Sequence, residues 1–248
     1  PAELAEHETA AGLLTGAVGN LFAWLRERLR GGGGTTELAA QARLRELAHA
    51  AGLALPAAPI VAFGEHTADP HYAPVPATDA ALSPHELVLV DAWARLPRDG
   101  APFADLTWMG VAWEEPPHEW AQMFAILCRA RDHGVEAVRH AAAAGKPVTG
   151  AQVDRVVRGV IEAAGYGDYF LHRTGHSLGA EVHGLGVNLD AVESPDERDI
   201  PPGAVFTIEP GVYFPGRFGM RTEVDVALLP GGPKVTTVPF QTELMLLG

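Results

Sequence analysis

Five residues of the types that bind divalent metal ions are difficult to explain as parts of a hydrophobic core. They are Asp91, Asp105, His176, Glu209 and Glu223. Each of the four acids lies in a short apolar segment with the pattern of a β-strand, where an unpaired carboxylate is costly to bury. One arginine could neutralise one such acid, but four acids in separate strands favour a shared cation. Carboxylates with an imidazole suit Mn, Fe, Co or Zn better than a metal that prefers thiolates.

The spacing of the acids supports a common site. Asp91 and Asp105 are separated by the same number of residues as Glu209 and Glu223. Each pair could lie on adjacent antiparallel strands joined by a loop, with both carboxylates on one face. Two such hairpins facing each other would gather four oxygen ligands, and His176 would add a nitrogen. A single acid of this kind is more often a turn cap or half of a surface ion pair, so the prediction depends on the joint pattern.

Other catalytic and metal-binding patterns fit less well. His172 and His176 have the spacing of a zincin helix, but no Glu follows the first and a glycine precedes the second. Cys128 is the single cysteine, which excludes an internal disulfide and a zinc site built from cysteine pairs. Its apolar neighbours predict a buried thiol. Ser177 lacks the flanking glycines of a nucleophile elbow, and residues 184–186 do not form a phosphate-binding fingerprint.

The composition excludes further classes of function. The net charge is −13, which argues against a nucleic-acid partner, because phosphates are bound by clustered Lys and Arg. Hydrophobic residues make up 47% and charged residues 20%, as in a globular protein with a substantial core. No apolar run is long enough to span a bilayer and no signal-peptide pattern is present, so we expect a cytoplasmic protein without a membrane partner.

The elements that must position these residues mix helices with strands. Apolar residues at helical spacing predict a helix over 3–30, and Thr36 can cap a second helix with Glu37 in its first turn. We interpret residues 1–55 as a helical lead-in with a structural role. Strands are expected at 60–63, 87–93, 104–108, 204–213, 220–228 and 235–246, and helices from Pro117 to about Ala144 and after the Thr149–Gln152 capping box. One mixed α/β domain over residues 1–248 is the simplest organisation.

These segments resemble the family of aminopeptidase P, prolidase and methionine aminopeptidase, from about residue 60 to the end of the chain. The motifs that carry the resemblance are His71-Tyr72, Asp91, Asp105-Leu-Thr-Trp108, Gly175-His176-Ser-Leu-Gly179, Glu209-Pro-Gly211 and Arg221-Thr-Glu223. The resemblance implies the pita-bread fold, an α/β (α+β) arrangement in which helices flank a curved, mostly antiparallel sheet. It also implies two divalent metal ions per chain, with manganese expected first and cobalt, zinc or iron as alternatives.

By the same resemblance, Asp91 would bind one metal ion with both oxygens, and Asp105 and Glu223 would bridge the two ions. His176 and Glu209 would complete the second site, and Glu209 would also take part in catalysis.

Further residues are implied to contact the substrate. His71 and His183 match histidines that hold the peptide and support the tetrahedral intermediate, and both are expected to be catalytic. His172 is expected to line the pocket, and Arg221 is expected to contact substrate or to orient Glu223.

The chain departs from the family pattern in two places. Where the family usually has Asp-x-Gly, this sequence has Asp91-Ala-Trp93, and Trp93 should face the same pocket as Asp91 because strand side chains alternate. The separate N-terminal domain of many relatives is expected to be absent or truncated, and the protein could form a homodimer.

The resulting hypothesis is a binuclear metallopeptidase that cleaves short peptides, first of all at Xaa-Pro bonds. The alternatives are a methionine aminopeptidase-like or broader aminopeptidase, and a catalytically silent peptide-binding protein with the same fold.

Overall fold

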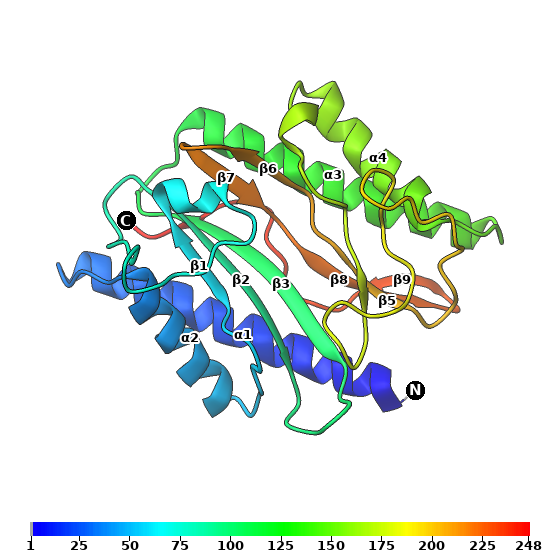
Figure 1. The fold of residues 1–248 in the computed structure, drawn as a ribbon, viewed down its shortest axis with the longest axis horizontal. Coiled ribbons are helices and arrows are strands. Elements are labelled where there is room, and N and C mark those ends of the chain that lie inside the picture. Colours follow the sequence, from blue (N-terminus) through cyan, green and yellow to red (C-terminus); the bar gives the residue numbers. More distant parts are fainter. Residues whose placement is uncertain (1) are drawn as a thin grey trace.

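The computed structural model describes residues 2–248, and its first two elements are helices (Figure 1). α1 spans Ala2–Arg30 and buries one apolar face along its length. α2 spans Glu37–Ala50 and begins at Thr36, whose hydroxyl oxygen accepts the backbone N–H of Ala39 at 3.3 Å. Both expected helices are therefore confirmed, together with the predicted cap. No helix within residues 2–248 is long and apolar enough to cross a bilayer.

The first sheet has the strand order β1-β2-β3-β10. Its strands are β1 (Ile60–Phe63), β2 (Leu87–Arg95), β3 (Phe103–Val111) and β10 (Met245–Leu246). β1, β2 and β3 pair antiparallel, and β10 adds a parallel edge. The register of β2 and β3 pairs Asp91 with Thr107 and Trp93 with Asp105. Asp91 and Asp105 are consequently diagonal neighbours on one face of the sheet, as the hairpin prediction requires.

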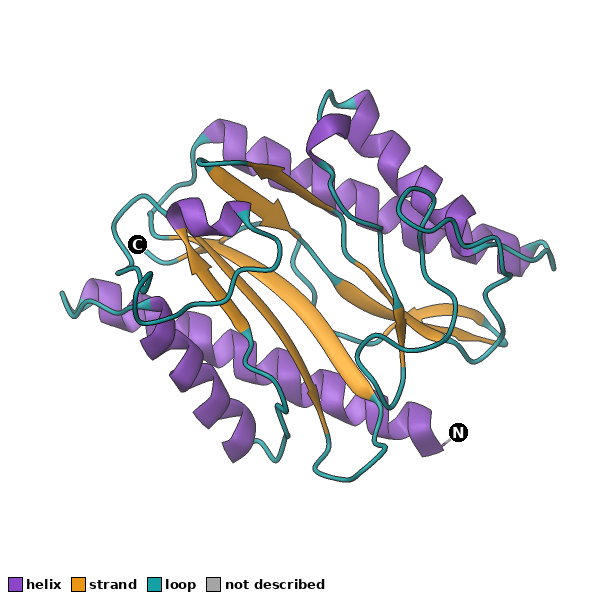
Figure 2. Ribbon diagram, viewed as in Figure 1, coloured by secondary structure: helices purple, strands orange, loops and turns teal. Residues whose placement is uncertain are grey.

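The strands of the second half form a four-stranded sheet and a hairpin (Figure 2). The sheet has the order β4-β5-β8-β9, and β6 pairs with β7. These strands are β4 (Ser177–Leu178), β5 (Val205–Ile208), β6 (Gly211–Phe214), β7 (Phe218–Arg221), β8 (Val224–Leu229) and β9 (Gly232–Val235). Ile208 pairs with Val224, and Gly211 pairs with Arg221. Both pairings belong to the same antiparallel register. Between them, where no strand is formed, this register places Glu209 opposite Glu223.

The expected strands 204–213 and 220–228 were wrong as continuous elements. Each is divided at its acid, because Pro210 has no N–H to donate and the N–H of Glu209 donates to Thr174 O at 2.8 Å instead of to the neighbouring strand. The expected strand 235–246 was also wrong over most of its length. The side-chain amide of Gln241 takes its place at the edge of β3, accepting from Met109 N–H at 2.6 Å and donating to Met109 O at 2.8 Å.

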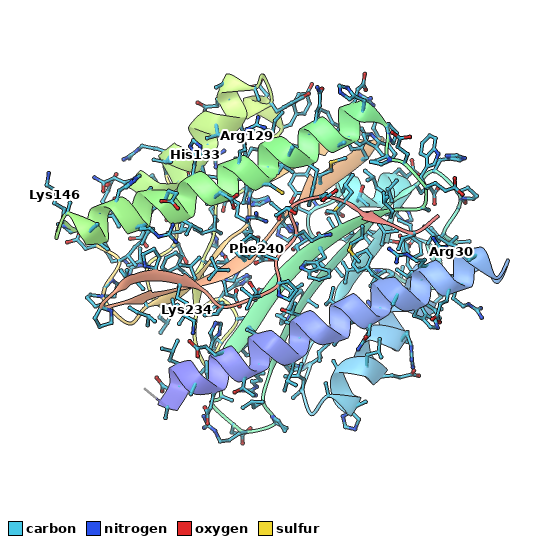
Figure 3. The ribbon with its side chains drawn as sticks, turned by 180° about the vertical axis from the view of Figure 1, so that it is seen from behind. Arg30, Arg129, His133, Lys146, Lys234 and Phe240 are labelled. Carbon is cyan, nitrogen blue, oxygen red and sulfur yellow. The ribbon has the colours of Figure 1, made fainter. Side chains whose placement is uncertain are left out.

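Helices cover the strands on two sides. α1 and α2 contact β1, β2 and β3, whereas α3 (His118–Ala143) contacts β5, β7 and β9, and α4 (Gly150–Ala163) packs on α3. Seen from behind, α1 and α3 lie across the strands and the C-terminal segment runs between them (Figure 3). Two hydrophobic cores result. One lies between α1, α2 and one face of the first sheet, and the other joins α3 and α4 to the later strands and to the opposite face of the first sheet. The mixed α/β architecture with mostly antiparallel strands is as expected.

Candidate metal centre

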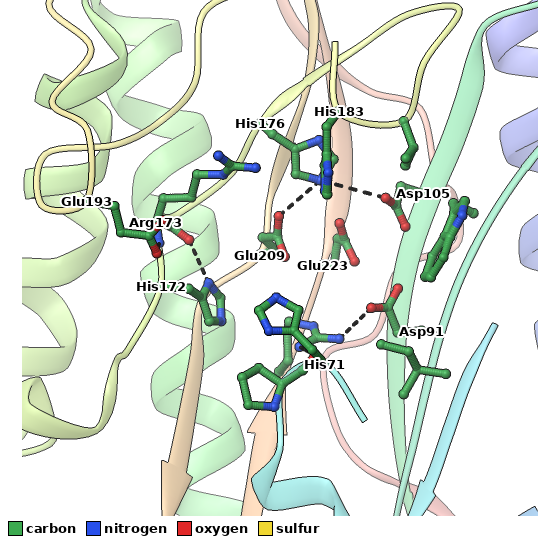
Figure 4. A pocket seen from close by; sticks show the side chains of 15 residues that line it. His71, Asp91, Asp105, His172, Arg173, His176, His183, Glu193, Glu209 and Glu223 are labelled. Carbon is green, nitrogen blue, oxygen red and sulfur yellow. Dashed lines mark hydrogen bonds and ion pairs between the residues drawn. The ribbon is translucent and has the colours of Figure 1, made fainter. Parts of the chain in front are cut away.

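One pocket gathers every residue that we predicted to bind metal, take part in catalysis or contact the substrate. It has a volume of about 230 Å³ and lies where the first sheet meets the second group of strands. Figure 4 shows its side chains pointing toward a common centre. The pocket contains His71, Asp91, Trp93, Asp105, His172, His176, His183, Glu209, Arg221 and Glu223. Ile60, Pro70, Arg173, Val182 and Glu193 also line it and were not singled out in the sequence.

The centre of the pocket is a cluster of buried metal-binding groups. One ligand atom from each of Asp105, His176 and Glu223 lies within 4.8 Å of the others. Nε2 of His176 is 3.8 Å from Oδ2 of Asp105 and 3.3 Å from Oε1 of Glu209. Four residues that are far apart in the sequence therefore meet around one point.

His176 presents an unprotonated nitrogen to this cluster. Its Nδ1 lies 3.3 Å from the carbonyl oxygen of Ser177, and donation to that oxygen leaves Nε2 as the acceptor. Burial lowers the pKa of His176 to about 4, so the ring is neutral at physiological pH. The lone pair of Nε2 thus faces the oxygens of Glu209 and Asp105. A divalent cation between these three atoms would be coordinated by all of them.

The carboxyl groups are strained in the absence of a cation. Burial, followed by the charges of neighbouring acids, raises the pKa of Asp105 and of Glu223 well above the ordinary range. Burial likewise raises the pKa of Glu209 to about 7. Oδ1 of Asp105 is buried without a hydrogen-bond partner. Both observations fit divalent metal ions, which would neutralise the acids and occupy the free oxygen.

Two threonines orient the two glutamates. Thr107 Oγ1 donates to Glu223 Oε2 at 2.7 Å, and Thr207 Oγ1 donates to Glu209 Oε1 at 3.0 Å. Thr207 Oγ1 also accepts the backbone N–H of His176 at 3.0 Å. Such hydrogen bonds hold ligand oxygens in a fixed direction. Sequence reasoning missed both threonines, although Thr207 lies two residues before Glu209 and so on the same face of an extended segment.

Asp225 is a further buried acid that sequence reasoning missed. Its Oδ2 accepts the backbone N–H of Asp105 at 2.9 Å, and it lies 3.8 Å from Nε2 of the buried His7 in α1. Burial raises the pKa of Asp225 well above its usual range. The signal was present, because Asp225 is an acid in an apolar strand like the others. It supports the backbone of Asp105 and does not line the pocket.

The guanidinium of Arg221 is bonded to protein groups through all three of its nitrogens. Its guanidinium pairs with Asp91, donates through Nε to Thr107 at 3.0 Å and through Nη1 to the hydroxyl oxygen of Tyr213 at 2.8 Å. The link to Glu223 runs through Thr107 rather than directly. Tyr213 lies 2.8 Å from Nε2 of His172, whose pKa is lowered to about 3 by burial, so this histidine is neutral. The contacts favour orientation of Asp91 over contact with substrate.

Three further side chains form the wall around the acids. Trp93 packs against the hydrophobic core that includes α3 and α4, and not against the core formed by α1 and α2. The ring of His183 meets that of His176 edge-on, with centroids 4.4 Å apart. His71 is exposed and lies in the loop between β1 and β2, on the opposite side of the pocket from His183 (Figure 4).

Comparison with known proteins finds one family across most of this chain. The model of metallopeptidase family M24 matches residues 5–229. The probable dipeptidase PepE of Mycobacterium bovis is 34% identical over 210 residues, which cover 84% of this chain and 52% of that protein. The chain thus spans about half the length of the curated relatives it matches.

Solved structures agree with this match. Dipeptidase PepE from Mycobacterium ulcerans has a TM-score of 0.84 and 32% identity, covering 99% of this chain and 60% of its own. The X-Pro aminopeptidase from Thermotoga maritima has a TM-score of 0.85 and 26% identity, covering 99% of this chain and 63% of its own. These likenesses confirm the fold that the resemblance implied.

Proposed function

Because this chain belongs to metallopeptidase family M24, we propose that it is a peptidase that requires two divalent metal ions and hydrolyses short peptides, preferably at Xaa-Pro bonds. The observation that carries the proposal is the convergence of Asp105, His176, Glu209 and Glu223 around one point, with Asp91 beside them. Relatives named as a dipeptidase and as an X-Pro aminopeptidase support the substrate class.

The donor set favours two ions over one. Five donor residues are more than a single tetrahedral ion needs, and oxygen-rich donors with one imidazole suit manganese. We propose that Asp91, Asp105, His176, Glu209 and Glu223 would together hold the two ions. When bound, such ions would supply positive charge that polarises the scissile carbonyl and makes a water molecule more acidic.

The chain itself would supply proton transfer and orientation. Glu209 lies at the centre of the pocket, and we propose that its carboxylate accepts the proton of the attacking water and passes it to the leaving amine. His183 and His71 would hold the polar groups on either side of the scissile bond as charge develops on the carbonyl oxygen. The indole of Trp93 would give the proline ring an apolar wall.

A panel of peptides tests the proposal. The purified protein, freed of metal and reloaded with Mn, Co or Zn, is assayed on Xaa-Pro dipeptides, matched dipeptides without proline, and longer peptides that begin with Met. Metal-dependent cleavage with preference for Xaa-Pro supports it. Preference for the Met peptides would indicate a methionine aminopeptidase-like enzyme, and binding of peptides without any cleavage would indicate a silent peptide-binding protein.

A further inference from the structure

Glu37 is a fully buried acid on α2, outside the pocket and far in sequence from the residues that line it. Its exposed fraction is 0%, although it lies in the first turn of the helix, where an acid is usually solvated. Burial of a carboxylate is costly unless several donors surround it. Glu37 is not among the residues that line the pocket, so its surroundings must be explained by another role.

Four donors surround the carboxylate, and all belong to β1 or the loop that follows it. Oε1 accepts the backbone N–H of Phe63 at 2.7 Å and lies 2.9 Å from Nδ1 of His66. Oε2 accepts the hydroxyl of Tyr72 at 2.6 Å and the backbone N–H of Ala80 at 3.1 Å. The rings of His66 and Tyr72 also stack on each other, with centroids 4.5 Å apart. One side chain thus ties together both ends of residues 64–80.

We call residues 64–80 the His71 loop, because they carry the pocket histidine. His71 itself has one local anchor, the bond from its backbone N–H to Asp69 Oδ1 at 2.9 Å. Its neighbours are held more firmly: Tyr72 binds Glu37, and the carbonyl oxygen of Pro70 accepts from Arg221 Nη1 at 3.3 Å. The position of the exposed His71 ring therefore depends on the anchors on either side of it.

We propose that Glu37 is a positioning residue that fixes the His71 loop, so that His71 reaches the substrate in the pocket. This inference rests on the proposed peptidase function. A carboxylate is needed because it offers acceptors to four donors and brings no hydrogens of its own. An amide in its place would point N–H groups at two of those donors. The helical lead-in would then have a direct part in substrate recognition.

The test compares Glu37→Gln with a matched control, Thr36→Ala. Thr36 caps the same helix end, but its loss leaves the four donors of Glu37 in place. Hydrogen exchange should speed up across residues 64–80 in Glu37→Gln and not in Thr36→Ala. Metal content should equal that of the parent in both. Because a misplacement of about 1 Å can cost on the order of 10²-fold in rate, kcat/KM for an Xaa-Pro dipeptide should fall by about that factor in Glu37→Gln alone.

A double-mutant cycle decides whether Glu37 acts through His71. In a His71→Ala background, Glu37→Gln should change kcat/KM by no more than about twofold, since the group it positions is gone. Tyr72→Phe removes one of the four donors, and it gives a milder variant should Glu37→Gln fold poorly. Its loss of activity should be smaller and should also vanish in the His71→Ala background.

Three results would overturn the inference: unchanged exchange in residues 64–80, equal losses of activity in Thr36→Ala and Glu37→Gln, or undiminished loss in the His71→Ala background. If the parent cleaves no peptide, the proposed function fails instead, while the exchange measurement still decides whether Glu37 orders the His71 loop.

Discussion

Replacing Glu209 with Gln should stabilise the metal-free protein at pH 8, although it removes a proposed ligand. Burial raises the pKa of Glu209 from 4.5 to about 7, against the opposing charge of Arg221. A folded-state pKa above the unfolded value means that the folded chain holds this proton more tightly. The contribution of Glu209 to stability therefore falls as pH rises from about 4.5 to about 7. Deprotonation in the fold costs about 3 kcal/mol, which a neutral Gln avoids.

Urea unfolding in the presence of a chelator measures this effect. At pH 8 the metal-free Glu209→Gln variant should exceed the parent in unfolding free energy by up to about 3 kcal/mol, and at pH 5 the difference should fall below about 1 kcal/mol. At pH 8 the neighbouring histidines, whose pKa values are lowered by burial, are neutral in both proteins and do not obscure the comparison. With manganese present the order should reverse, because the parent gains more from binding. A metal-free variant that is no more stable than the parent at pH 8 would refute the reasoning.

Three further substitutions test the roles proposed for the pocket. His183→Ala should lower turnover by about 10² to 10³ while metal content stays unchanged, and unchanged turnover would leave His183 as a surface histidine. Trp93→Gly should gain on longer peptides relative to Xaa-Pro dipeptides, whereas equal loss on all substrates would mean that Trp93 only supports the fold. Thr107→Val removes the hydrogen bond to Glu223 and should weaken metal affinity by about 10- to 100-fold in a chelator competition; an unchanged affinity would exclude orientation by Thr107.

The sequence predicted the meeting of the acids because their spacing and surroundings carry geometric information. Asp91 and Asp105 lie on paired strands whose register makes them diagonal neighbours, as their apolar surroundings and equal spacing indicated. Glu209 and Glu223 also face each other, but in a gap between two short pairings rather than within long strands. The pattern of apolar residues runs across that gap, so it could not reveal the interruption.

Other parts of the site depend on contacts that local patterns do not encode. Glu37 looked like an ordinary first-turn acid, since nothing in α2 reveals that Tyr72 and Ala80 would bind it. Arg173 and Glu193 reach the pocket from irregular segments, for which no periodicity predicts the direction of a side chain. Asp225 was detectable as an acid in an apolar strand, and the resemblance drew attention only to residues with a known counterpart.

The most direct test of the central hypothesis is the number of metal ions per chain, measured by elemental analysis after loading with manganese and removal of free metal. We expect about two ions in the parent and fewer in Asp105→Ala and in Glu223→Ala, because each substitution removes a buried carboxylate from the centre of the proposed donor set. The same samples should show that Xaa-Pro hydrolysis rises with metal content. A parent that binds one ion or none, or variants that bind as much as the parent, would contradict the two-metal site.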